Sequence, residues 1–107
     1  MYVIIWEYVV RSDRAAEFVD AYGPRGPWAE LFGRADGFLG LELLRREDRA
    51  DCYLTIDRWR SLGHFEAFKA RLEADYHRLD EAFSELTLEE ERIGSFTLPS
   101  DQERGQT

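Results

Sequence analysis

Apolar residues follow a strand-like period in some segments of the chain and a helical period in others. Four segments rich in β-branched, aromatic and leucine side chains are predicted strands: 2–10, 38–46, 52–60 and 87–98. Three segments are predicted helices, two from apolar residues every three or four positions and one from a favourable proline start: 15–22, 62–86 and 27–34. The order is therefore strand, helix, short helix, strand, strand, helix, strand.

This order of elements is typical of an α+β domain. It is the ferredoxin-like βαββαβ pattern, which predicts a four-stranded antiparallel sheet with helices on one face. The second and third strands are expected to form a hairpin that brings Leu41 near Ile56 and Phe38 near Trp59. The predicted domain covers residues 1–98, and residues 99–107 form a polar C-terminal tail.

The first predicted strand is apolar on both faces, which a half-solvated antiparallel sheet does not explain. One face carries Val3, Ile5 and Val9, and the other carries Tyr2, Ile4, Trp6, Tyr8 and Val10. Helices of the same chain can cover only one face. A second copy covering the other predicts a homodimer, and the alternative is that the C-terminal segment folds over it.

Length and charge narrow the classes of function. A chain of 107 residues suits one domain, and a net charge of −8 argues against nucleic acid and anionic membranes as partners. The single cysteine, Cys52, lies in an apolar run and is expected to be buried and reduced. The first ten residues lack a basic start and meet charge at Glu7, so they predict neither a signal peptide nor a membrane span. The expected location is the cytoplasm.

Two short motifs border the predicted hairpin: Asp36-Gly37-Phe38 and Trp59-Arg60-Ser61. With the element order and the length, they resemble the antibiotic biosynthesis monooxygenase (ABM) family of the dimeric α+β barrel superfamily, over residues 1–98. Segment 22–32, with Tyr22-Gly23-Pro24, Gly26, Trp28 and Leu31-Phe32, is similar to a bacterial subgroup of ABM-like proteins. The resemblance implies a homodimer that forms a dimeric α+β barrel, with a pocket between helices and sheet in each subunit.

The resemblance also implies two kinds of chemistry, cofactor-free oxidation of aromatic polyketides or quinols and oxidative haem degradation. Haem-degrading relatives use an asparagine on the first strand and a tryptophan and a histidine on the long helix. This chain contains no asparagine, and Phe68 and Arg78 stand near the other two positions. His77 is one residue away, which turns it by about 100° from the apolar face. We therefore expect neither haem nor any other cofactor.

Cofactor-free oxygenation needs a dry pocket, a hydrogen-bond donor and a base. Six aromatic residues are candidates for binding a small aromatic or apolar ligand: Tyr22, Trp28, Trp59, Phe65, Phe68 and Tyr76. Such an aromatic stripe is more often ordinary core, and Trp59 is alternatively part of the dimer face. His64, beside the apolar stripe of the long helix, is the candidate catalytic acid or base. The alternative is a solvent-exposed histidine in the first turn.

Other constellations carry no chemistry. His64 and His77 are thirteen positions apart and give no metal-ligand spacing, so no metal is expected. The run 89–91 of three glutamates is explained by a solvated edge strand. The favoured function is a cofactor-independent monooxygenase of a small aromatic or quinol-like substrate. The alternatives are a non-catalytic dimeric binding protein for a small apolar ligand and, third, an isomerase or cyclase.

Overall fold

The computed structural model describes residues 1–100 of the chain. The strands are β1 (Tyr2–Val10), β2 (Phe38–Arg45), β3 (Cys52–Trp59) and β4 (Thr87–Thr97). The α-helices are α1 (Ala15–Tyr22), α2 (Pro27–Gly33) and α3 (Leu62–Phe83), with short 3-10 helices at Ser12–Arg14 and Ser84–Leu86. Each predicted element is present, with ends within three residues of those expected. Most of the predicted polar tail, 101–107, lies outside the described residues.

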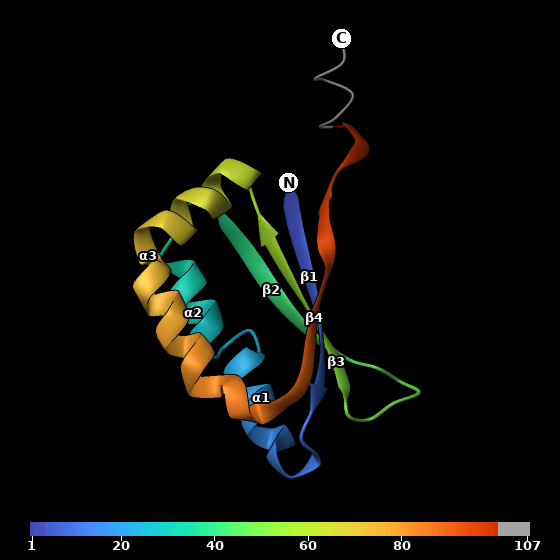
Figure 1. Ribbon diagram of the computed structural model, residues 1–107. Helices are drawn as coiled ribbons and strands as arrows, with labels where there is room; N and C mark the ends of the chain where they lie inside the picture. The colour runs from blue at the N-terminus through green and yellow to red at the C-terminus, as the bar shows by residue number, and fades with distance from the viewer. Residues whose placement is uncertain (101–107) are drawn as a thin grey trace.

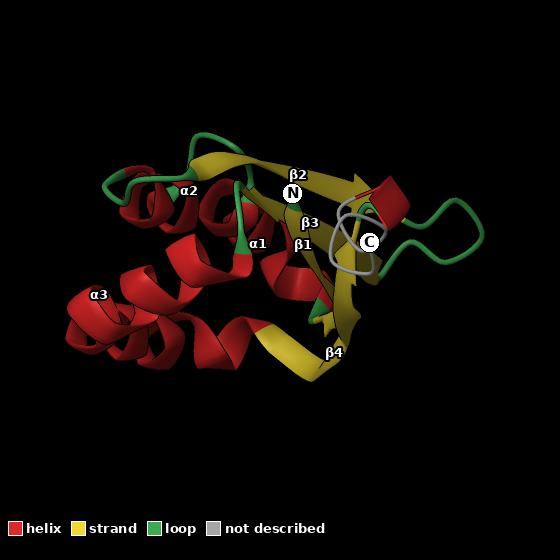
Figure 2. Ribbon diagram, turned by 90° about the horizontal axis from the view of Figure 1, so that it is seen from above, coloured by secondary structure: helices red, strands yellow, loops and turns green. Residues whose placement is uncertain are grey.

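The four strands form one antiparallel sheet in the order β2-β3-β1-β4. Figures 1 and 2 show α1, α2 and α3 together on one face of this sheet. The predicted ferredoxin-like α+β fold is thereby confirmed. No helix in the described part of the chain is long and apolar enough to cross a membrane.

The core lies between the helices and the alternate side chains of β1 that point toward them. Tyr2, Ile4, Tyr8 and Val10 are all buried. Tyr8 packs on Phe18 of α1 with ring centroids 5.3 Å apart. The even-numbered residues of β1 therefore anchor the helices to the sheet, as the predicted alternation required.

The opposite face of the sheet is also apolar, and no described helix packs on it (Figure 2). On this face the cross-strand neighbours are Val3 and Phe96, Ile5 and Ile56, and Leu54 and Leu44. Phe96 and Leu44 are 47% and 45% exposed. Cys52 is a free cysteine on this face and is buried, as predicted. We call this surface the open face.

The predicted register of the β2–β3 hairpin is wrong beyond its first pair. Phe38 pairs with Trp59 as expected, but Leu41 pairs with Asp57 rather than Ile56. The cause is an irregularity between Phe38 and Gly40, where Gly40 has φ +147°, a conformation that favours glycine. The extra residue turns Leu41 to the helix side of the sheet, and Asp57 lies beside it there.

The two family-like motifs meet at one corner of the sheet. The Arg60 N–H donates to the Gly37 carbonyl at 2.7 Å. Ser61 caps α3, its Oγ accepting a hydrogen bond from the His64 N–H at 3.2 Å. Gly37 has φ +89°, and a Cβ on it would overlap the His64 ring. The turn before β2 thus requires glycine for two reasons: its backbone conformation and the space that the His64 ring occupies.

We expect Gly37→Ala to lower the free energy of unfolding by about 1–3 kcal/mol, because it strains a left-handed backbone and collides with His64. Gly33→Ala is the matched control, since no atom lies within 4 Å of its added Cβ. The unfolding free energy of Gly33→Ala should equal that of wild type or exceed it by less than about 1 kcal/mol. Urea denaturation measures the unfolding free energy of both variants. If Gly37→Ala is as stable as Gly33→Ala, the structural role given to Gly37 is wrong.

Candidate active site

A cavity of about 90 Å³ lies between the helices and the sheet. Its wall combines aromatic rings with three acidic side chains and one threonine. The lining residues are Trp6, Tyr8, Tyr22, Trp28, Phe32, Leu41, Thr55, Asp57, Tyr76, Asp80 and Glu90. A space of this size holds several waters or part of a small organic molecule.

Asp57 is the buried acid of this cavity. Its side chain comes from the helix-facing side of β3, where Ile4 and Leu41 are its cross-strand neighbours, and the residue is only 7% exposed. No described residue gives it a hydrogen bond or an ion pair. Burial therefore raises the pKa of Asp57 to about 7. A carboxyl with this pKa can take up or release a proton near neutral pH.

Three tyrosines of the cavity wall remain protonated. Burial raises the pKa of Tyr8 and of Tyr22 well above the usual value, and it raises the pKa of Tyr76 to about 12. At neutral pH each keeps its O–H. The cavity thus pairs one titrating carboxyl with several neutral hydroxyl groups.

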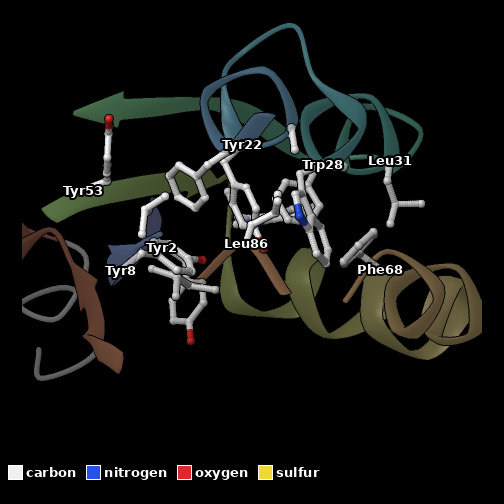
Figure 3. Packing of buried hydrophobic residues seen from close by; sticks show 14 residues of the cluster. Tyr2, Tyr8, Tyr22, Trp28, Leu31, Tyr53, Phe68 and Leu86 are labelled. Carbon is white, nitrogen blue, oxygen red and sulfur yellow. The ribbon is translucent and has the colours of Figure 1, made fainter. Parts of the chain in front are cut away.

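The rings of the cavity wall form a continuous layer from α1 through α2 to α3. Figure 3 shows Tyr22 and Trp28 side by side, with ring centroids 6.0 Å apart. Trp28 meets Tyr76 edge to face at 5.0 Å. Lys69 places its Nζ 3.5 Å from the centroid of the Tyr76 ring. Three elements far apart in the sequence therefore share one aromatic wall.

Asp80 of α3 and Glu90 of β4 mark the side on which the cavity opens, since both are exposed. Burial, followed by the charge of Asp80, raises the pKa of Glu90. β4 is an edge strand, as the glutamate run predicted. The register puts Glu89 and Glu91 on the open face, but Glu90 pairs with Tyr8 and faces the cavity. Glu90 is therefore more than part of a solvated edge.

His64 lies at a different hollow, of about 320 Å³, which includes Asp36, Ser61, Phe68 and Arg71. Its Nδ1 is 2.6 Å from Ser61 Oγ, and its Nε2 is 3.7 Å from Asp36 Oδ2. His64 is thus placed at the start of α3 and does not meet Tyr22 and Tyr76 in one cavity.

The six aromatic residues proposed from sequence divide into two groups. Tyr22, Trp28 and Tyr76 line the cavity. Trp59, Phe65 and Phe68 pack in the core instead; Trp59 is fully buried, and its ring lies 5.1 Å from that of Phe68. Trp59 is on the helix side of the sheet and so takes no part in the open face.

Sequence reasoning missed Asp57, although a signal was present. β3 places Tyr53, Thr55, Asp57 and Trp59 on one face, and the two aromatic ends of this series indicate burial. An aspartate between them is then a polar group inside the core. The predicted hairpin register missed only that Leu41 lies beside Asp57.

The chain belongs to the antibiotic biosynthesis monooxygenase family, whose model matches residues 1–79. Three solved structures of similar fold illustrate the relationship. The first is a mutant form of SnoaB from Streptomyces nogalater, described as a cofactor-independent oxygenase; it shows 22% identity, 92% coverage of each chain and a TM-score of 0.69.

The other two are candidate antibiotic biosynthesis monooxygenases. One is from Nitrosomonas europaea, with 17% identity, coverage of 92% of this chain and 99% of that one, and a TM-score of 0.69. The other is from Bordetella bronchiseptica, with 20% identity, coverage of 91% and 95%, and a TM-score of 0.69. Identities this low establish a common fold and no more. No curated protein matches the sequence significantly.

The raised pKa of Asp57 makes folding stability depend on pH. The folded state holds the proton up to about pH 7, whereas the unfolded chain releases it near pH 4. The stabilisation is complete below the unfolded pKa and is lost as pH rises through about 7. As pH rises from 5 to 8, wild type should lose about 3 kcal/mol of unfolding free energy through Asp57, whereas Asp57→Asn should not show this loss. Urea denaturation at both pH values tests this.

Asp20→Asn is the control, because Asp20 is an exposed aspartate on α1. Its unfolding free energy should follow that of wild type at both pH values. If Asp57→Asn also follows wild type, Asp57 is not buried as a protonated acid.

Proposed function

We propose that this protein is a cofactor-independent monooxygenase acting on a small aromatic or quinol-like substrate, with Asp57 as its general base. The main support for this proposal is the carboxyl of Asp57, which titrates near neutral pH and has no hydrogen-bond or ion-pair partner among the described residues. It lies in a cavity walled by aromatic rings. The membership of the family and the similarity to a cofactor-independent oxygenase support the reaction class.

The proposed reaction starts with a proton transfer. Asp57 as carboxylate takes a proton from the acidic C–H or O–H of a substrate such as an anthrone or a quinol. For an anthrone, the carbanion gives its electrons to O₂ and a new carbon–oxygen bond forms. The resulting peroxide anion takes back the proton held by Asp57 and becomes a substrate hydroperoxide. Loss of the second C–H proton then breaks the O–O bond and releases water. Overall, the CH₂ group and O₂ become a carbonyl group and water, and O₂ is the oxidant.

The cavity wall supplies what the developing anion needs. Tyr8, Tyr22 and Tyr76 keep their O–H groups because burial raises the pKa of each. Neutral hydroxyl donors in an apolar site stabilise an enolate or peroxide oxygen more strongly than water would. The apolar rings limit water near the reactive anion and favour a planar aromatic substrate.

The same geometry favours Asp57 over His64 as the base. Asp57 lies among the aromatic residues that would hold the substrate, whereas His64 is at the second hollow. The His64 ring is already engaged by Ser61 and packs against Gly37. We therefore assign the proton transfer to Asp57 and a structural role to His64.

We expect Asp57→Asn to reduce oxygen uptake with an anthrone or a quinol by at least about 100-fold, the usual contribution of a general base. In wild type, kcat/KM should rise with pH and level off above about pH 7, because only the carboxylate accepts the proton. An oxygen electrode measures both. Asp20→Asn serves as the control for a lost surface charge.

His64→Ala decides between the two candidate bases. We expect it to keep oxygen uptake, with its fold confirmed by circular dichroism. Loss of uptake in His64→Ala together with full activity in Asp57→Asn would return the catalytic role to His64. If the wild type binds these compounds but consumes no oxygen, the non-catalytic binding function takes the place of this proposal.

The homodimer predicted from sequence is part of the proposal. The open face presents apolar side chains from all four strands, among them Leu44, Ile56 and Phe96. Soluble monomers seldom leave such a surface to water. A second copy related by a two-fold axis would cover it with the same surface and complete a barrel.

We expect wild type to be a dimer at micromolar concentration in size-exclusion chromatography with light scattering. Ile56→Arg, which puts a charge in the centre of the open face, should halve the measured mass. Leu62→Arg is the matched control, because Leu62 is 48% exposed and lies on α3, across the sheet. A wild-type mass of one chain rules out the barrel.

A further inference from the structure

The charged side chains that line the cavity are all acidic. Asp57, Asp80 and Glu90 line it, while no lysine, arginine or histidine is among the lining residues. Within the described residues, neither Asp80 nor Glu90 forms an ion pair. Of the neighbouring cations, Lys69 lies over the Tyr76 ring and Arg92 donates to the Tyr2 hydroxyl at 3.2 Å. Lys69 lies close enough to interact with the charge of Asp80, but neither Asp57 nor Glu90 has an ion-pair partner among the described residues.

Asp57 supplies a second and independent sign of a ligand. A carboxyl that is 7% exposed and has no hydrogen-bond partner among the described residues is costly to bury. A molecule in the cavity with a donor group would satisfy it. The deep acid and the two acids at the opening therefore form one acceptor-rich, aromatic-walled site.

The arrangement does not suit a metal ion. The described part of the chain holds no group of three His, Cys, Asp or Glu residues able to bind one. Aromatic rings such as Trp28 and Tyr76 line the space that the three acids border. Aromatic faces and carboxylates together are the usual surroundings of an organic ammonium group. Lys69 already makes a cation–π contact of this kind with Tyr76.

We propose that the cavity selects a phenol-type substrate that also carries a positively charged amine, with the phenol toward Asp57 and the ammonium group between Asp80 and Glu90. This rests on the proposed function for the identity of the site, and it adds the charge of the substrate. The net charge of −8 favours the approach of such a cation over that of an anion.

Three phenols test this; each carries a para two-carbon chain, which ends in an ammonium, a methyl or a carboxylate group. Tyramine is the cation, 4-propylphenol is its neutral counterpart, and 3-(4-hydroxyphenyl)propionate is the anion. Isothermal titration calorimetry at pH 7.5 and low salt gives the three affinities for the whole protein. Tyramine should bind about tenfold tighter than 4-propylphenol, and the anion should bind most weakly.

The double variant Asp80→Asn, Glu90→Gln should lose the tyramine preference and keep the affinity for 4-propylphenol. Glu89→Gln, Glu91→Gln is the matched control: it removes the same amount of charge, but from the open face of β4. It should keep the preference. Equal loss in both double variants would mean that only overall charge acts, and would overturn the site.

The remaining outcomes are equally decisive. The inference is wrong if 4-propylphenol or the anion binds as tightly as tyramine, or if none of the three binds. Binding is measured here without turnover, so it is separate from oxygen uptake. Oxidation of a quinol without a preference for the cation would remove this inference alone. A cation preference without oxidation of any phenol would remove the oxygenase proposal alone.

Discussion

β1 is the strand on which the rest of the molecule depends. It hydrogen-bonds to β3 on one side and to β4 on the other, so two of the other three strands pair with it. Its side chains are apolar on both faces, and water is unfavourable for either. One face is covered by the helices through contacts such as Tyr8 with Phe18. No described helix covers the other face (Figure 2).

An irregularity in β2 decides which of its side chains face the helices. The extra residue before Gly40 turns Leu41 toward the helices and brings it beside Asp57, which already faces them through the alternation of β3. At Asp57 an acid takes the place of an apolar core side chain, at a cost in stability that a well-packed residue would avoid. Such departures from good packing concentrate at functional sites, because activity needs groups that the fold alone would not choose. Asp57 is the clearest departure in this cavity.

The motifs typical of the family lie at one corner of the sheet. They are separate from the residues that surround the cavity. Gly37 and Ser61 hold the corner between β2 and the start of α3, and His64 fills the space between them. This corner fixes where α3 begins. Tyr76 and Asp80 lie further along α3, beyond a kink at Leu72 (φ −115°, ψ 26°), so this kink also helps to set their position at the cavity. A motif can thus be diagnostic of a scaffold while the residues that line the cavity lie outside it.

The sequence by itself determined the elements, their order and the two-sided burial of β1. Hydrophobic periodicity is a local property, and it fixes which side chains share a face within one strand or helix. The sequence did not determine which faces meet. The bulge at Gly40 shifts the hairpin by one residue, and a shift of one residue moves every later side chain of the strand to the other face. Only the tertiary structure therefore brought Asp57, Tyr76 and Glu90, from three separate elements, to one cavity and left His64 at another.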